Sequence, residues 1–225
     1  DMIFPIGDEQ VHGGHKAFFS YLFLILNVVV FLFEMSLPEA TLNAFTGYFG
    51  ATPDEFLHGE RLYTLVTSLF LHGGWAHLLG NMLFLWVFAD NIEATIGSFK
   101  FLLFYLAGGI LASMTHSILN SSSQMPCVGA SGAIAACLGA YLVMFPKSRI
   151  KVLILIFFTT FRVPAILFLG IWIGQQFLAG FGTLGAATSD TAGVAYWAHI
   201  GGFVFGVASG FLFRSRAREM VLSDS

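Results

Sequence analysis

Six long apolar stretches constrain the fold of this sequence more than any other feature. They cover about residues 17–36, 74–91, 101–119, 127–145, 163–181 and 195–213. A helix that crosses a bilayer needs about 20 largely apolar residues, with a range of roughly 17–25, so each stretch is long enough to span. The sequence therefore predicts an all-α, polytopic membrane protein with six transmembrane helices in one domain over residues 1–225.

The composition excludes the main alternatives to a membrane protein. Hydrophobic residues make up 56% of the 225 residues and charged residues 10%, whereas soluble domains carry about 25% charged residues. A chain this apolar neither stays disordered nor hides its apolar surface in a soluble core. The net charge of −3 gives no basic surface for nucleic acid. Cys127 and Cys137 lie ~15 Å apart if both are on one helix, so we expect no disulfide.

The basic residues predict an orientation for the six helices. With an even number of spans, both termini share one side of the membrane. Nine of the ten basic residues then lie on that side, namely Lys16, Lys100, Lys147, Arg149, Lys151, Arg162, Arg214, Arg216 and Arg218. Only Arg61 lies on the other side. Because basic residues concentrate in cytoplasmic loops, we expect both termini in the cytoplasm. No cleavage site follows the first stretch, so we expect no cleavable signal peptide.

Three connections between the stretches are unusual. Residues 37–73 are too many for a simple turn and mix aromatic with polar residues, which indicates short helices in the membrane interface. Residues 152–161 are apolar but few, and we interpret them as an interfacial or folded connection, with a seventh span as the alternative. Residues 182–193 are rich in Gly, Ala, Thr and Ser, which predicts a mobile loop.

Four polar residues fall at a similar depth within three of the predicted helices. Ser131 and His199 lie near the outer starts of the fourth and sixth helices, and His77 and Asn81 share one face of the second, ~5–10 Å below the outer surface. Polar groups inside a membrane are costly, so each is a candidate functional residue. Taken singly, Ser131 fits a packing seam of small residues equally well, and the other three fit structural hydrogen bonds.

Taken together, the four residues suggest nucleophilic catalysis. If the small-residue seam formed by Gly202 and Gly206 packs against the fourth helix, it brings His199 towards Ser131, where a base activates a serine. His77 and Asn81 would then donate to an oxyanion. No acidic third member is evident within the predicted helices, so the arrangement is a dyad.

Three ordered sequence blocks resemble the rhomboid intramembrane serine proteases. They are His72-Gly-Gly-Trp-Ala-His77-Leu-Leu-Gly-Asn81, Gly129-Ala-Ser131-Gly132 and Ala198-His199-Ile-Gly-Gly202-Phe-Val-Phe-Gly206. The resemblance implies a six-helix core with Ser131 as nucleophile, His199 as general base, and His77 and Asn81 stabilising the oxyanion. It implies transmembrane protein substrates in a lipid bilayer, with no metal or cofactor. Residues 37–73 would be the membrane-embedded loop, and residues 182–193 the cap over the site.

Two departures from the family pattern concern the surroundings of the dyad. Tyr63-Thr64 stand where many members have Trp-Arg, and Ala135 stands where some have a tyrosine that stacks on the histidine. His199 must therefore be oriented differently. We interpret Gln175 and Gln176 as packing or lipid-facing residues.

The alternative function is a catalytically silent membrane chaperone or binding protein of the same fold. The compact form favours a bacterial inner membrane, and the substrate and oligomeric state are not readable from the sequence.

Overall fold

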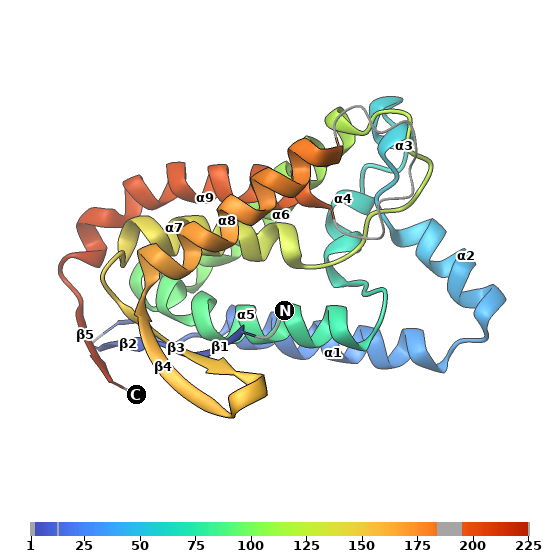
Figure 1. Ribbon diagram of the computed structural model, residues 1–225. Helices are drawn as coiled ribbons and strands as arrows, with labels where there is room; N and C mark the ends of the chain where they lie inside the picture. The colour runs from blue at the N-terminus through green and yellow to red at the C-terminus, as the bar shows by residue number, and fades with distance from the viewer. Residues whose placement is uncertain (1–2, 13, 184–194, 225) are drawn as a thin grey trace.

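The computed structural model describes residues 3–12, 14–183 and 195–224 and is mostly helical (Figure 1). The long helices are α1 (Phe19–Ser36), α5 (Trp75–Ile96), α6 (Ser98–Leu119), α7 (Ser131–Met144), α8 (Ala165–Thr183) and α9 (Tyr196–Ala217). The shorter segments are α2 (Glu39–Phe49), α3 (Pro53–Leu57), α4 (Thr64–Thr67), η1 (Ser68–Phe70) and η2 (Leu155–Phe157). The strands are β1 (Ile3–Gly7), β2 (Glu9–His12), β3 (Arg149–Ile154), β4 (Thr159–Pro164) and β5 (Val221–Asp224).

Four of the described helices, α1, α6, α8 and α9, are long and apolar enough to cross a membrane. Helix α7 is apolar but has only 14 residues. Helix α5 has 22 residues, and it carries Asp90 and Glu93 as well as His77. The structure thus supports an integral membrane protein, and the count of six spans remains a prediction.

Several helix boundaries differ from those predicted. Helix α5 continues past Asp90 to Ile96, because the N-terminal segment covers the polar residues there: Asn91 accepts from the backbone of Val11 and donates to Asp8. Helix α7 begins at Ser131 rather than Cys127, because Cys127 pairs with Ala51 in an isolated β-bridge.

Small strands gather at one end of the helix bundle, which we call the strand end (left in Figure 1). The order β1-β3-β4 forms one antiparallel sheet, and β2 pairs with β5. Residues 152–161 belong to the β3–β4 hairpin, so they are a folded connection, and the alternative of a seventh helical span is wrong. The strands also mean that the all-α prediction holds only for the bundle.

Glu93 of α5 fixes the start of α1. Its carboxylate accepts hydrogen bonds from the backbone N–H groups of Phe18, Phe19 and Ser20 at 2.8–2.9 Å and from the Ser20 hydroxyl at 2.7 Å. The first N–H groups of a helix lack intrahelical partners, and here a buried side chain of another helix supplies them. The contact sets how α1 lies beside α5 (Figure 1).

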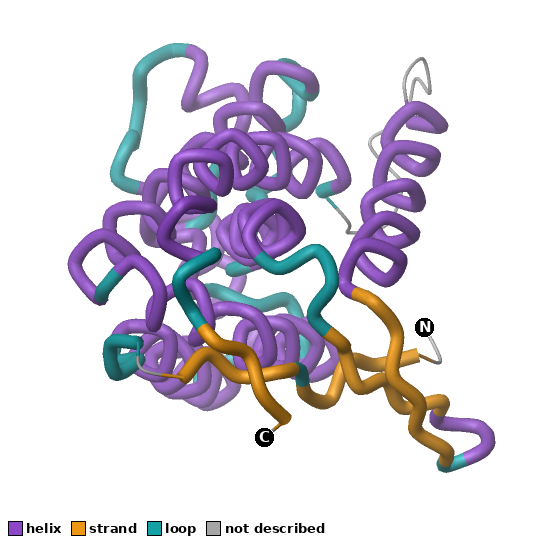
Figure 2. Tube along the Cα trace, turned by 90° about the vertical axis from the view of Figure 1, so that its left-hand side faces the viewer, coloured by secondary structure: helices purple, strands orange, loops and turns teal. Residues whose placement is uncertain are grey.

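Helix α7 forms the centre of the bundle, and glycines join it to α9. Its residues from Gly132 to Tyr141 are all buried. A Cβ atom on Gly202 would lie 2.1 Å from the Gly132 carbonyl oxygen, and one on Gly206 would lie 2.0 Å from the Ala136 carbonyl oxygen. The predicted seam of Gly202 and Gly206 therefore does pack against α7. Helix α8 lies at the side of the bundle (Figure 2) and is the least buried of the four candidate spans.

The long connection between α1 and α5 contains α2, α3, α4 and η1, which lie at the end of the bundle opposite the strands (Figure 1). Arg61 is held in this connection by Glu55 and by the Gly47 carbonyl oxygen. The other nine basic residues lie in or beside elements of the strand end: the segment before α1, the first turn of α6, the β3–β4 region and the end of α9. The predicted cap, residues 182–193, lies mostly outside the described residues.

Candidate active site

Ser131 is the first residue of α7, and the loop before it is held by the long connection. The Gly129 N–H donates to the Ser68 carbonyl oxygen at 2.8 Å, and Cys127 is bridged to Ala51. Backbone N–H groups in the first turn of a helix have no intrahelical partner, so they face outward beside the Ser131 side chain. Ser131 thus lies where a helix start, a fixed loop and two neighbouring helices meet.

His77 lies against this loop with a defined ring proton. The backbone N–H of Gly73 donates to His77 Nδ1 at 3.3 Å, so in the neutral ring the proton is on Nε2. Gly129 has φ +124°, and a Cβ atom there would lie 2.7 Å from His77 Nε2. Only glycine suits this backbone conformation and this close approach. The Nε2–H group of His77 therefore points at the loop that leads into Ser131.

Asn81 approaches the same loop one turn further along α5. Its Nδ2 atom would lie 3.5 Å from a Cβ atom on Gly129. The Asn81 amide also donates to His72 Nε2 at 3.0 Å. Burial, with the neighbouring His77, lowers the pKa of His72 to about 4, so His72 stays neutral and accepts this bond at physiological pH. His72 is thereby a structural partner of Asn81, and its backbone N–H donates to Glu34 of α1 at 3.2 Å.

His199 lies in the first turn of α9 and contacts two residues of α8. Its Nδ1 donates to Gln176 Oε1 at 2.7 Å, and its ring packs against Trp172 with the centroids 5.8 Å apart at 37°. Gln176 therefore packs between α8 and α9 and does not face the lipid. The one sequence signal for a role of Gln176 is that it is a polar side chain inside an apolar stretch. That signal does not tell which helix Gln176 faces.

The α7–α9 seam places the segments of Ser131 and His199 face to face. A Cβ atom on Gly132 would lie 3.9 Å from both the Cβ and the carbonyl oxygen of Ala198, the residue before His199. Among the described residues, neither Ser131 Oγ nor His199 Nε2 has a hydrogen-bond partner. In the absence of substrate, hydrogen bonds between catalytic groups are commonly long or poorly aligned. The described residues contain no group of three His, Cys, Asp or Glu side chains placed to hold a metal ion.

Comparison with known proteins identifies the family. The sequence model of the rhomboid domain matches residues 59–216, more than half of the chain, and the chain therefore belongs to the rhomboid family. It is 36% identical over 143 residues to "Rhomboid protease GluP" of Bacillus subtilis, covering 63% of this chain and 27% of that protein. It is 34% identical over 126 residues to "Putative rhomboid protease YdcA" of the same organism, covering 54% and 59%.

A mitochondrial relative is more distant. The human "Presenilin-associated rhomboid-like protein, mitochondrial" is 28% identical over 152 residues, which are 64% of this chain and 36% of that protein. The chain thus spans between 27% and 59% of the length of these three relatives. The residues that the rhomboid domain model matches include Ser131, His199, His77 and Asn81.

Proposed function

We propose that this protein is an intramembrane serine endopeptidase that cleaves transmembrane helices of other membrane proteins near their outer end. The observation that carries the proposal is the convergence of α5, α7 and α9 on the short segment from Gly129 to Gly132. His77 and Asn81 approach this segment at Gly129, and Ala198, the neighbour of His199, approaches it at Gly132, which supports a common site with Ser131. The family membership and the two relatives named as rhomboid proteases support the same activity.

In the proposed reaction, His199 is the general base and Ser131 the nucleophile. The Gln176 oxygen only accepts hydrogen bonds, so it keeps the proton of neutral His199 on Nδ1 and leaves the lone pair on Nε2. When Nε2 reaches the Ser131 hydroxyl, it takes up the hydroxyl proton as the oxygen attacks the peptide carbonyl carbon. His199 then returns the proton to the leaving amine, and water hydrolyses the acyl-enzyme.

The negative charge on the tetrahedral intermediate would be stabilised by donors from α5 and α7. His77 Nε2–H and the second N–H of the Asn81 amide face the loop before Ser131, and the backbone N–H groups at the start of α7 lie beside them. Such preorganised donors favour the oxyanion over the ground-state carbonyl. No step requires a metal or a cofactor.

The orientation proposed with this function puts the strand end and both termini in the cytoplasm, in a bacterial inner membrane. Nine basic residues at the strand end support it, because basic residues are retained on the cytoplasmic side. Helices α5, α7 and α9 all run towards the strand end, so their first turns, which carry the candidate site, lie near the opposite surface. Water would enter the site from there.

The test is cleavage of a transmembrane reporter by purified protein in vesicles. Ser131→Ala and His199→Ala should each abolish cleavage. The control Ser209→Ala changes a serine of α9 that lies outside the candidate site, and it should leave cleavage intact. A fluorophosphonate should label the protein at Ser131 and no longer label Ser131→Ala. Retained cleavage in Ser131→Ala would refute the proposal. A protein that neither cleaves nor reacts with the fluorophosphonate would be the silent chaperone or binding protein.

A further inference from the structure

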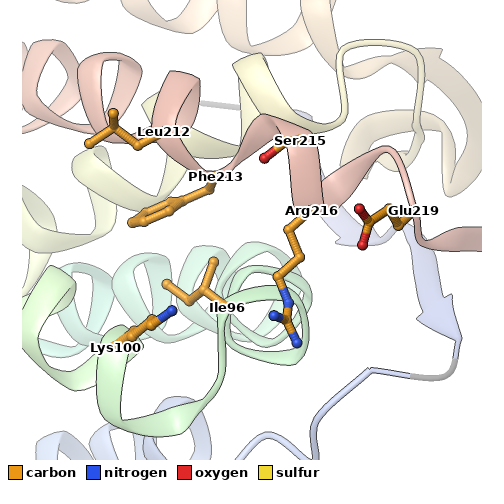
Figure 3. Close-up of a pocket in the computed structure, with 7 residues that line it drawn as sticks. All are labelled: Ile96, Lys100, Leu212, Phe213, Ser215, Arg216 and Glu219. Carbon is orange, nitrogen blue, oxygen red and sulfur yellow. The ribbon is translucent and has the colours of Figure 1, made fainter.

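A cavity of about 340 Å³ opens at the strand end of the bundle (Figure 3). It lies between the α5–α6 junction and the end of α9. The junction contributes Ile96 and Lys100, and the end of α9 and the turn after it contribute Leu212, Phe213, Ser215, Arg216 and Glu219. Its volume falls in the roughly 300–1,000 Å³ range of small-molecule sites. None of the proposed catalytic residues lines it.

One side of the cavity is basic. Lys100 lies in the first turn of α6 and Arg216 in the last turn of α9. Figure 3 shows the Arg216 side chain reaching from α9 towards the helices that carry Ile96 and Lys100. The guanidinium donates to His15 Nε2 at 3.2 Å, and the His15 backbone donates to the Ala94 carbonyl oxygen at 2.8 Å. The Arg216 charge is therefore held over the cavity.

The other side of the cavity is apolar and continuous with the lateral surface of the bundle. Ile96 is buried and Phe213 half-buried, whereas Leu212 is 79% exposed. An exposed leucine on a candidate membrane span faces the acyl chains of the bilayer. A ligand that fills this cavity must therefore have a charged part and an apolar part that lie side by side.

The net charge of the lining indicates the charge of the ligand. Lys100 and Arg216 are opposed within the lining by one carboxylate, Glu219, which leaves a formal charge of +1. Arg214 and Arg218 flank Arg216 on the same helix end. Basic pockets between membrane helices on the cytoplasmic side bind anionic headgroups. The Ser215 hydroxyl adds a neutral donor to the lining.

We propose that this cavity binds the headgroup of an anionic glycerophospholipid, with the phosphate between Lys100 and Arg216 and an acyl chain along Leu212 and Phe213. The bound lipid would bridge the α5–α6 junction and the end of α9. The proposal rests on the orientation proposed above and needs no catalytic activity, so lipid binding and reporter cleavage can fail independently of each other.

The experiment measures lipid binding to the full chain in detergent, by native mass spectrometry with dioleoylphosphatidylglycerol and, as the zwitterionic reference, dioleoylphosphatidylcholine. The double variant Lys100→Gln, Arg216→Gln should bind phosphatidylglycerol about 30-fold more weakly, since each basic residue contributes about 1 kcal/mol to anionic-lipid binding. The control Lys147→Gln, Arg149→Gln removes two exposed charges from the same end but outside the cavity, and should bind as the unchanged protein does.

A second variant distinguishes the site from a general loss of structure. Glu219→Gln removes the one carboxylate of the lining and should strengthen phosphatidylglycerol binding about fivefold. Unchanged or weaker binding in Glu219→Gln would overturn the proposal. Equal losses in the two double variants would overturn it too, as would equal binding of phosphatidylcholine. Displacement of the lipid by inorganic phosphate at the same concentration would show a free-anion site and refute the lipid assignment.

Discussion

His199 Nδ1 lies 2.7 Å from Gln176 Oε1, and this contact joins α9, the helix of the proposed base, to α8 at the side of the bundle. In the better-known serine proteases a carboxylate orients the histidine. Here a neutral amide occupies that place, and Trp172 packs on the ring at a centroid distance of 5.8 Å. The amide selects the useful tautomer without adding a charge inside the membrane, where a charge would be costly.

Gln176→Leu should lower kcat of reporter cleavage by roughly 10- to 100-fold, part of the roughly 10²–10⁴-fold that general-base catalysis supplies. KM should change little, because Gln176 acts through His199. Gln176→Glu keeps the acceptor and should recover much of the loss. Gln175→Leu is the matched control, since Gln175 is the exposed neighbour on the same helix. A KM effect with unchanged kcat would assign Gln176 to substrate binding instead.

Asn81→Ala should lower kcat by about 10²–10³-fold, the usual cost of losing an oxyanion donor, again with KM little changed. His72→Leu should have a smaller effect, about tenfold, because His72 only accepts from the Asn81 amide and so sets its orientation. Steady-state kinetics on one reporter would rank the two variants. A larger loss in His72→Leu than in Asn81→Ala would mean that His72 itself contacts the substrate.

The close contact between α7 and α9 requires glycine at position 206. Gly206→Ala places a methyl group where 2.0 Å separates it from the Ala136 carbonyl oxygen, so the two helices must move apart. Overpacking of this kind costs about 1–3 kcal/mol, and the separation also withdraws His199 from Ser131. Both the unfolding temperature and cleavage should fall. Gly174→Ala in α8 meets no atom within 4 Å and should keep activity, with stability unchanged or raised by up to about 1 kcal/mol.

The sequence predicted the bundle and the segments of the site because both depend on local signals. Apolar stretches locate the long helices, and the spacing of Gly202 and Gly206 identifies the face that meets α7. The ends of the helices depend on partners far along the chain, and these escaped prediction. Asn91 and Glu93 extend α5 because they bind residues 8–20, more than 70 positions away.

The candidate site also combines residues that local sequence signals reveal with contacts that depend on distant partners. Ser131, His199, His77 and Asn81 are visible as polar residues in apolar helices. The Gln176–His199 contact is not, because it depends on which side of α8 faces α9 and no periodic signal reveals that. The strands of the β3–β4 hairpin were also not predicted, because they are short and because β3 pairs with β1, which lies at the other end of the sequence.

The last prediction concerns Asp8, which connects the N-terminal segment to the bundle at the strand end. Its carboxyl group accepts hydrogen bonds from Asn91 Nδ2 at 2.7 Å and Gln10 Nε2 at 2.9 Å, and it contacts the Tyr141 hydroxyl. Burial raises the pKa of Asp8 from 3.8 to about 7, the bond from Tyr141 opposes the shift, and the neighbouring charge of Asp90 adds to it.

Because the pKa of Asp8 is higher in the folded protein than in the unfolded chain, the folded state binds the proton more tightly. The contribution of Asp8 to stability is therefore greatest below about pH 4 and is lost as the pH rises through about 7. Between pH 5 and pH 8, the unfolding temperature in detergent should fall with increasing pH relative to that of Asp8→Asn, and hydrogen exchange of β1 and β2 should become faster relative to that variant. Asp8→Asn carries no titrating proton and should lack the Asp8 part of both dependences. Ser223→Ala, a change in β5 that leaves all carboxyl groups in place, should retain them, and a pH dependence that persists unchanged in Asp8→Asn would assign it to another group.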